Sequence, residues 1–339
     1  MINSNFGFTP LKEVWLGDCY PSSWYDHLPN KIADPFRQIT EWTKEDTGKL
    51  QKFLESRGII VRRPVFESID DHIDSSGNLS KPPITPRDDY LVLNKTLYSL
   101  HNTLDNDPWR HNMSLYHSLG YDVQSPRDTA INCLYPPSLV RIGKDIYIDQ
   151  DTHNHVFGYL SEWLVELAKD YRVHICNTDG HSDGVFCPLK NKVIASTHYK
   201  TDYTQSFPDW EIFSIPNNLN NSNQLTDWKL YDSSIDNNNA FSEHIISRAS
   251  SWVGDFKETV YEVNMLVIDE HNVIAMKEYP PLTEWLYKHG INVHYFDFRT
   301  RSFWDGGWHC LTLDIEREDS QTTDLFPERG ENGVYWRLK

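Results

Sequence analysis

The stretch of the chain with the clearest chemical potential is residues 303–318, FWDGGWHCLTLDIERE, where two glycines precede a cysteine. The apolar residues that alternate after Cys310 predict a strand. Gly306 and Gly307, at the mouth of that strand, allow the backbone to approach a ligand closely. A thiolate at Cys310 can act as a nucleophile if positive charge lies nearby, including the charge of a guanidinium substrate. The commoner explanation of such an isolated pattern is a buried structural cysteine beside a turn.

A second candidate is residues 177–186, NTDGHSDGVF, in which His181 and Asp183 alternate around Ser182 and glycines flank the pair. On a strand, both side chains would face the same side. A histidine and a carboxylate that face one pocket can supply a general acid and base together with an anionic contact. A metal site and a plain loop are the alternatives for so short a pattern.

A third candidate is residues 85–94, TPRDDYLVLN, where Arg87, Asp88 and Asp89 directly precede an apolar run that predicts a strand at 90–93. Carboxylates at the entrance of a strand can bind a guanidinium through paired hydrogen bonds. Solvated turn residues are the commoner outcome for such a pair of acids.

Two other patterns are weak evidence. His153 and His155 have the spacing of zinc ligands, but no third ligand is evident and the chain contains no HExxH sequence. Asn94 begins a glycosylation sequon, which matters only in a secreted protein. We therefore expect no metal site, and the chemistry considered above requires no cofactor.

The elements that would position these residues recur along the chain as a loose repeat. In each unit, apolar residues spaced as on one helical face are followed by a turn and then by the alternation typical of a strand. The expected strands lie at residues 59–61, 121–123, 171–175 and 291–293, and a fifth, degenerate unit lies near Trp210. Three of the helices end in glycine, at Gly58, Gly120 and Gly290, which suits a left-handed helix end. Such repetition predicts a ring or stack of helix–strand modules, and ordinary α/β alternation without symmetry is the alternative.

Two segments have the composition of surface insertions. Residues 69–86 are rich in turn formers, and residues 215–228 are mostly Asn and other polar types. Neither resembles a tether long enough to separate two domains. We therefore expect residues 1–339 to form a single domain.

Composition and charge narrow the class of protein. The formal net charge of −17 argues against a nucleic-acid partner, which would require clustered Lys and Arg. The same charge weakly favours a cationic substrate, although its commoner role is to keep a protein soluble. No stretch of the sequence approaches the ~20 apolar residues that cross a bilayer, so we expect no membrane partner.

The cysteines and the start of the chain point to one compartment. The five cysteines are scattered and form no CxxC pair, which argues against a disulfide framework and suits free thiols in a reducing cytoplasm. The first residues lack the basic region and apolar run of a secretory signal. We therefore expect a cytoplasmic protein.

Taken in order, these segments resemble the arginine:glycine amidinotransferase family, guanidino-modifying enzymes with the pentein fold. The similar segments are FTPLKEVWLG, TPRDDYLVLN, VRIGKDIY, LAKDYRVHI followed by DGHSDGVF, VNMLVIDEHNVIA and GGWHCLTLDIER. They span nearly the whole chain, and their order and spacing are more specific than any one of them. The resemblance implies an α/β fold, a five-bladed propeller with pseudo-five-fold symmetry, which would account for the repeat.

Carried over position by position, the resemblance also implies roles for individual residues. Cys310 matches the nucleophile and His181 the general acid and base, while Asp88 and Asp183 match carboxylates that hold the guanidinium. The implied enzyme moves the amidino group of L-arginine to an acceptor amine, glycine by default, through a covalent adduct on Cys310. The products would be L-ornithine and guanidinoacetate.

The chain departs from the family pattern at three places. Tyr135 stands where the family has the carboxylate that orients the histidine, and Ser138 replaces a second acidic residue. Lys200 replaces the arginine that binds the substrate carboxylate, which keeps the charge and loses the bidentate geometry. The serines at the amino-acid end of the substrate align near Lys257 and Glu258. Tyr135 is therefore assigned to the catalytic group, and Lys200 and Glu258 to substrate binding.

These departures leave three interpretations open. The first is an amidinotransferase whose partners are small molecules, L-arginine and an amine acceptor. The second is a guanidino hydrolase such as an arginine deiminase-like enzyme, which would result if water reached the adduct. The third is a catalytically silent arginine-binding protein. A homodimer is compatible with the implied fold.

Overall fold

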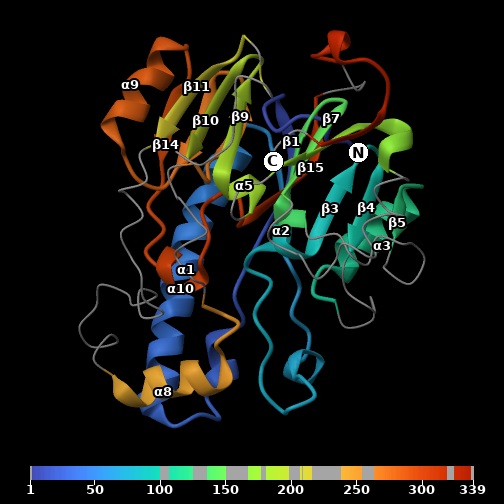
Figure 1. The fold of residues 1–339 in the computed structure, drawn as a ribbon. Coiled ribbons are helices and arrows are strands. Elements are labelled where there is room, and N and C mark those ends of the chain that lie inside the picture. The colour runs from blue at the N-terminus through green and yellow to red at the C-terminus, as the bar shows by residue number, and fades with distance from the viewer. Residues whose placement is uncertain are drawn as a thin grey trace.

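The protein is described by a computed structural model that covers residues 2–99, 107–124, 136–149, 167–176, 181–197, 207, 209–215, 238–253, 263–318 and 324–336. Its strands form five small, separate sheets, and none of these sheets closes on itself within the described residues (Figure 1). No helix within the same ranges is both long and apolar enough to cross a membrane.

The sheets share one strand pattern. In each of them an antiparallel pair is followed by a third strand that lies parallel to the second. The strands of the five sheets are, in order, β15 (Thr312–Arg317), β1 (Leu11–Leu16) and β2 (Ile60–Arg62); β3 (Tyr90–Leu93), β4 (Thr96–Ser99) and β5 (Asp122–Gln124); β6 (Leu139–Ile142), β7 (Asp145–Asp149), β8 (Arg172–Cys176) and the added β16 (Gly333–Trp336); β9 (Phe186–Lys190), β10 (Val193–Thr197) and β11 (Glu211–Ile215); and β12 (Leu266–Asp269), β13 (Asn272–Ala275) and β14 (Asn292–Tyr295).

The parallel third strands explain why the sequence repeats. Two parallel strands need a crossover connection, usually a helix, and α1 (Asn30–Ser56), α3 (Arg110–Ser118) and α9 (Pro280–Lys288) precede β2, β5 and β14. Gly58, Gly120 and Gly290 follow these helices with φ of 78°, 84° and 72°. The predicted helix–strand units, including the fifth one at β11, are therefore confirmed for their described residues.

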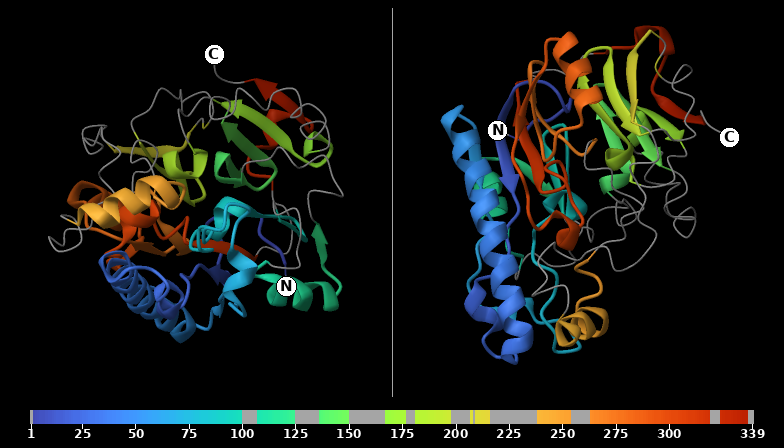
Figure 2. Two further views of the ribbon diagram at one scale, coloured as in Figure 1. Left: turned by 90° about the horizontal axis from the view of Figure 1, so that it is seen from below. Right: turned by 90° about the vertical axis from the view of Figure 1, so that its left-hand side faces the viewer.

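The remaining helices are short apart from α8. They are η1 (Ser22–Tyr25), η2 (Ile69–His72), α2 (Pro86–Asp89), η5 (Pro136–Ser138), α5 (Ser182–Val185), α8 (Asn239–Arg248), α10 (Arg301–Trp304) and η8 (Pro327–Arg329). The predicted insertion at 69–86 includes η2, and most of the one at 215–228 lies outside the described residues. In both views of the molecule α2 and α5 lie near its middle, with the sheets arranged around them (Figure 2).

The core next to Cys310 contains many aromatic side chains. It packs α1 and α8 against α10 and the turn that follows α10, and it includes Phe36, Trp252, Trp304 and Trp308, which are all at most 3% exposed. The Trp304 indole N–H donates a 2.8 Å hydrogen bond to the hydroxyl of Thr43 on α1, so the buried ring has its polar partner. This packing fixes the chain directly before Cys310.

Candidate active site

Cys310 lies in a turn just before β15, and its side chain is 6% exposed. The backbone N–H of Cys310 donates to Oδ1 of Asn264 at 3.0 Å, and Nδ2 of Asn264 lies 2.8 Å from Sγ of Cys310. The strand predicted after Cys310 is confirmed as β15. The cysteine is thus at the mouth of a strand, as its sequence context indicated.

The close approach that the two glycines permit is to other parts of the protein. A Cβ atom on Gly307 would lie 2.5 Å from the Cβ and Oδ1 atoms of Asn264. A Cβ atom on Gly306 would lie 2.9 Å from a methyl carbon of Leu311. Gly307 therefore leaves space for Asn264 beside Cys310, and Gly306 leaves space for Leu311.

The surroundings of Cys310 keep its thiol protonated. Burial raises the pKa of this thiol well above its ordinary value, and the carboxylates of Asp183 and Asp88 raise it further. The hydrogen bond from Asn264 and the charge of Arg87 act in the opposite direction. A positive charge placed between the thiol and the two carboxylates would therefore favour ionisation.

Asp183 is a buried carboxylate beside this thiol. Its side chain is 2% exposed, and Oδ2 lies 3.2 Å from Nδ1 of His309 without hydrogen-bond geometry. Within the described part of the chain, neither oxygen of Asp183 has a hydrogen-bond partner. Buried polar atoms are almost always paired, so an unpaired carboxylate points to a ligand that supplies donors.

The backbone that carries Asp183 differs from the prediction. A strand was expected to bring His181 and Asp183 to one side, but residues 182–185 form the single helical turn α5. The N–H of Gly184 donates to the carbonyl of His181 at 2.9 Å and closes that turn, and β9 begins only afterwards. The strand on which both side chains would face one side is therefore not formed here, because the alternation of three residues fits a strand or one turn of helix equally.

Asp88 lies on α2, directly before β3, as the sequence predicted. Its side chain is 27% exposed, and Lys81 Nζ lies 3.9 Å from Oδ2. Burial nevertheless raises the pKa of Asp88, and the charge of Lys81, a hydrogen bond with Thr85 and an electrostatic interaction with His181 partly offset that increase. The structure thus brings His181 into the electrostatic neighbourhood of Asp88, although 93 positions (181 minus 88) separate them in the chain.

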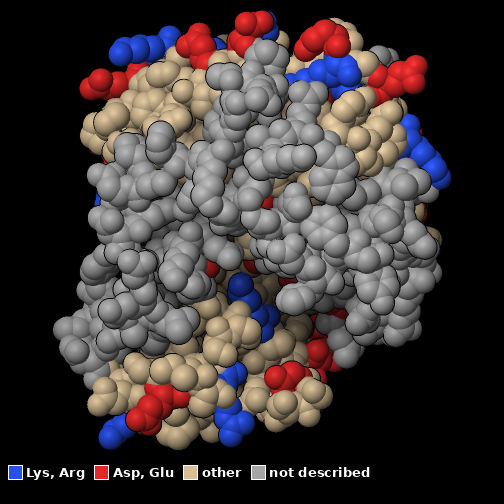
Figure 3. Space-filling model, in the orientation of Figure 1, with Lys and Arg blue, Asp and Glu red and all other residues tan. Residues whose placement is uncertain are grey.

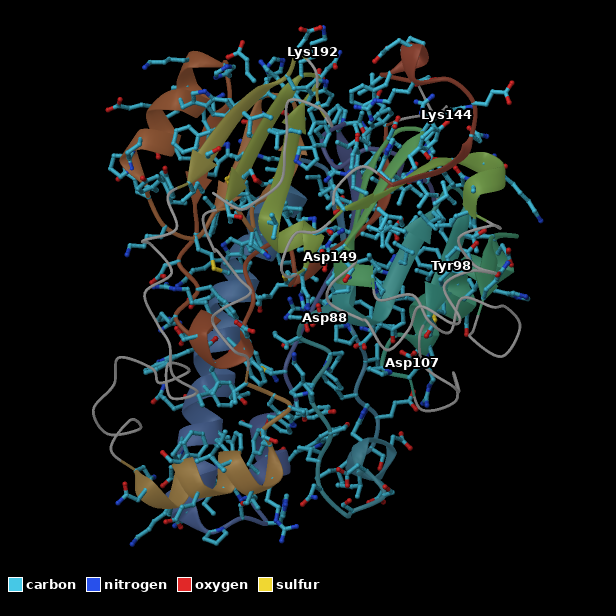
Figure 4. All side chains as sticks on the ribbon, in the orientation of Figure 1. Asp88, Tyr98, Asp107, Lys144, Asp149 and Lys192 are labelled. Atoms are coloured by element: carbon cyan, nitrogen blue, oxygen red, sulfur yellow. The ribbon has the colours of Figure 1, made fainter. Side chains whose placement is uncertain are left out.

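The site opens on the face of the molecule shown in Figure 3, which is hollowed near its centre. Figure 4, drawn in the same orientation, places Asp88 at this hollow and Asp149 close above it. Asp149 ends β7, is 5% exposed and was not singled out from the sequence. It is a further acidic group beside Asp88 in this view, and no pattern in the sequence gave a signal for it.

Arg87 ties the turn of Cys310 to β15. Its Nε donates to the carbonyls of His309 at 3.0 Å and of Thr312 at 2.9 Å, and its Nη2 donates to Oδ1 of Asp314 at 2.9 Å. Burial lowers the pKa of His309 and Arg87 lowers it further, whereas Asp183 and Asp314 act in the opposite direction. The sequence identified Arg87 but not this role, because its partners lie more than 200 residues away.

Behind the site, a cavity of about 90 Å³ is lined in part by Arg87, Asp183 and His309. Three assigned residues, Tyr135, Lys200 and Glu258, lie outside the described residues, as do His153 and His155. Ser138 is described, ends η5 and is 3% exposed. Within the described ranges, no three His, Cys, Asp or Glu side chains converge as a set of metal ligands.

The sequence is similar to those of known amidinotransferases. No protein-family model matches the sequence. The L-arginine:L-lysine amidinotransferase of Pseudomonas savastanoi pv. phaseolicola is 24% identical over 183 residues, which cover 52% of this chain and 42% of that enzyme. The chain therefore spans less than half the length of that relative. Inosamine-phosphate amidinotransferase 1 of Streptomyces glaucescens is 22% identical over 344 aligned positions, which cover 89% of this chain and 88% of the relative.

Solved structures extend the likeness to the fold. SxtG, an amidinotransferase from Microseira wollei, has a TM-score of 0.67 at 18% identity, with 95% of this chain and 99% of that chain covered. A dimethylarginine dimethylaminohydrolase from Pseudomonas aeruginosa has a TM-score of 0.52 at 13% identity, with 90% and 99% covered. The chain therefore has the mixed α/β pentein fold of these two proteins. In sequence the chain is similar to amidinotransferases, and it shares the fold of two solved amidinotransferases.

Proposed function

We propose that the protein transfers the amidino group of L-arginine to an acceptor amine through a covalent adduct on Cys310. The observation that carries the proposal is the buried carboxylate of Asp183, which has no hydrogen-bond partner among the described residues and raises the pKa of the Cys310 thiol. A guanidinium presents planar, paired N–H donors and a positive charge. It would satisfy the carboxylate and favour the thiolate at the same time.

The first half of the reaction uses the charges around Cys310. The guanidinium lies between Asp88 and Asp183, and its charge offsets the two carboxylates that otherwise keep the thiol protonated. The thiol passes its proton to His181, the thiolate attacks the central guanidino carbon, and the bond from that carbon to the departing nitrogen breaks. His181 protonates the nitrogen, so ornithine leaves and the amidino group remains on Sγ.

The second half reverses these steps with a different amine. The acceptor amine enters, His181 takes its proton, and the nitrogen attacks the amidino carbon. The carbon–sulfur bond breaks and Sγ leaves as the thiolate. We propose that the hydroxyl of Tyr135, which stands where the family has the orienting carboxylate, holds the imidazole of His181. Lys200 and Glu258, which also depart from the family pattern, would bind the amino-acid end of the donor.

The acceptor is the least constrained part of the proposal. Glycine is the acceptor that the sequence motifs suggest, and the product would then be guanidinoacetate. The names of the two relatives include lysine and inosamine phosphate, so primary amines of quite different size serve related proteins. We propose glycine as the first acceptor to test and lysine as the second.

We also propose that the five sheets are the blades of a five-bladed propeller with pseudo-five-fold symmetry. The shared strand pattern of the sheets and their placement around α2 and α5 support this arrangement. In such a ring, residues from several blades meet at the centre. Asp88, Asp183 and Cys310 precede strands of three different sheets, which fits that geometry.

Hydrolysis is the competing function, because a dimethylarginine dimethylaminohydrolase shares the fold. Both reactions begin with attack of a cysteine on the guanidino carbon and differ in the bond that breaks. In transfer the ornithine nitrogen leaves and an amine accepts the amidino group, whereas in hydrolysis the terminal nitrogen leaves and water releases the rest of the substrate as citrulline. The same assay separates them, since hydrolysis of arginine gives citrulline without any acceptor.

The test is to incubate the purified protein with L-arginine labelled in the guanidino carbon, alone and with glycine or lysine. With an acceptor we expect repeated turnover to ornithine and a labelled guanidino product. Without an acceptor we expect a labelled adduct on Cys310 and at most one equivalent of ornithine per protein. The Cys310→Ser variant is the control and should give neither. Citrulline without an acceptor would move the assignment to a hydrolase, and the absence of both adduct and product would contradict the proposal.

A further inference from the structure

Asn264 makes a polar contact of 2.8 Å with the thiol of Cys310. It lies two positions before β12, 46 residues before Cys310, and is 1% exposed. Its side chain forms two contacts with the same residue, from Oδ1 to the backbone N–H at 3.0 Å and from Nδ2 to Sγ at 2.8 Å. The N–H of His309 also lies 3.4 Å from the backbone carbonyl of Asn264. Asn264 is thus held against the turn at three points.

The hydrogen-bond partners of Asn264 determine which end of its amide faces Sγ. A backbone N–H can only donate a hydrogen bond, so the amide oxygen must face the N–H of Cys310. The amide NH₂ group must then face Sγ, and it can donate to sulfur whether the sulfur is a thiol or a thiolate. Gly307 keeps this position open, because a Cβ atom there would lie 2.5 Å from Asn264.

We propose that Asn264 is a further catalytic residue, whose amide N–H donates to Sγ of Cys310 and stabilises the thiolate. The effect on the free thiol needs no substrate, whereas the effect on turnover rests on the proposed function. A hydrogen bond to an ionised acceptor is stronger than one to a neutral acceptor. The donor therefore favours the thiolate over the thiol.

The same hydrogen bond serves both halves of the proposed reaction. In the first half, Sγ is the nucleophile and forms the carbon–sulfur bond as the bond to the departing amine breaks. In the second half, the acceptor nitrogen forms a bond to the amidino carbon, and Sγ departs with the electron pair of the carbon–sulfur bond. Sulfur carries negative charge at the start of one step and at the end of the other, so one fixed donor assists both.

Three charged groups also act on this sulfur. Asp183 and Asp88 oppose the thiolate, and Arg87 favours it. The amide is the neutral member of the set, so its contribution can be removed without changing the net charge. This separates its role from that of the ionic neighbours.

The decisive variant is Asn264→Asp. Its carboxylate keeps an oxygen that accepts from the N–H of Cys310, but it places a second oxygen where the NH₂ group faced Sγ. The carboxylate is ionised over the alkaline range in which the thiol titrates, so it repels the thiolate. We measure the rate of Cys310 alkylation by iodoacetamide against pH in substrate-free protein, and locate the modified residue by peptide mass spectrometry.

We expect the midpoint of this profile to move up by about one to two pH units in Asn264→Asp. Asn264→Ala, which lacks the donor and adds no charge, should move it in the same direction by less. Asn112→Asp is the matched control, since its amide donates to the carbonyl of Arg63 beside α3 and its profile should be unchanged. If Asn264→Asp does not fold, Asn264→Ser replaces it, because serine also removes the amide donor.

Turnover separates this inference from the proposed function. A wild-type protein that consumes no arginine, together with a shifted profile in Asn264→Asp, would refute the proposed reaction and support the thiolate hydrogen bond. A midpoint equal to that of the wild type in both Asn264→Asp and Asn264→Ala would overturn the inference even if the wild type transfers amidino groups. If the proposed function and the role of Asn264 are both correct, Asn264→Asp and Asn264→Ala should lower the rate of each half-reaction.

Discussion

Replacing Arg87 with methionine tests whether a single guanidinium holds the turn of Cys310. The Arg87 side chain is 16% exposed and that of Asp314 is 7% exposed, so water screens their 2.9 Å ion pair only weakly. The same guanidinium donates to the carbonyls of His309 and Thr312. Methionine has a similar length but no donor, so the substitution removes all three interactions and leaves the volume nearly filled.

The expected loss in the free energy of unfolding depends on which interactions each partner of Arg87 retains. Removing one member of a buried ion pair costs about 3–5 kcal/mol, because the other charge stays buried and unpaired. Asp314 retains Arg317, whose Nε lies 2.8 Å from Oδ2, and the carbonyl of His309 retains the N–H of Thr312. We therefore expect Arg87→Met to lower the free energy of unfolding by about 2–4 kcal/mol.

The assay is urea unfolding followed by circular dichroism and by tryptophan fluorescence. Arg301→Met is the control, because its partner Asp297 is 68% exposed and such surface pairs contribute about 0–1 kcal/mol. Arg87→Lys should be intermediate, since lysine keeps the charge but cannot donate in the planar fork of arginine. A loss for Arg87→Met no larger than that for Arg301→Met would refute the reasoning.

Two further predictions concern groups away from the site. Burial alone would raise the pKa of Asp145, but hydrogen bonds from His174 and a neighbouring arginine outweigh it and lower the pKa to about 2. Because this value lies below the unfolded pKa of about 3.9, the carboxylate stabilises the fold above pH 4 and less as the pH falls toward 2. Urea midpoints should therefore depend less on acid pH in Asp145→Asn, and an unchanged slope would contradict the assignment. In Gly17→Ala, the new Cβ atom would lie 1.9 Å from the backbone oxygen of Ile84, whereas in Gly48→Ala it would meet nothing within 4 Å. We therefore expect the melting temperature of Gly17→Ala to lie well below that of Gly48→Ala. Equal melting temperatures would show that the backbone at Ile84 moves aside freely.

The sequence by itself determined the elements whose signals are local. Alternating apolar residues predicted β3 and β15, and helical spacing followed by glycine predicted the ends of α1, α3 and α9. These signals work because a strand or a helix end is specified by a few neighbouring residues. The order of the motifs along the chain likewise predicted the similarity to amidinotransferases, and the local pattern predicted that Cys310 lies at the mouth of a strand.

Only the tertiary structure decided how the groups around the thiol are arranged. The contacts of Asn264 with Cys310 and of Arg87 with Asp314 join residues 46 and 227 positions apart, and no periodicity encodes such separations. Local reasoning also mistook the turn at His181 for a strand, since three alternating residues fit either conformation. The glycines before Cys310 were recognised as sites of close approach, but their partner became known only when the sheets brought Asn264 beside them. Contacts of this kind depend on how separate sheets pack together, which is a property of the whole chain rather than of any segment.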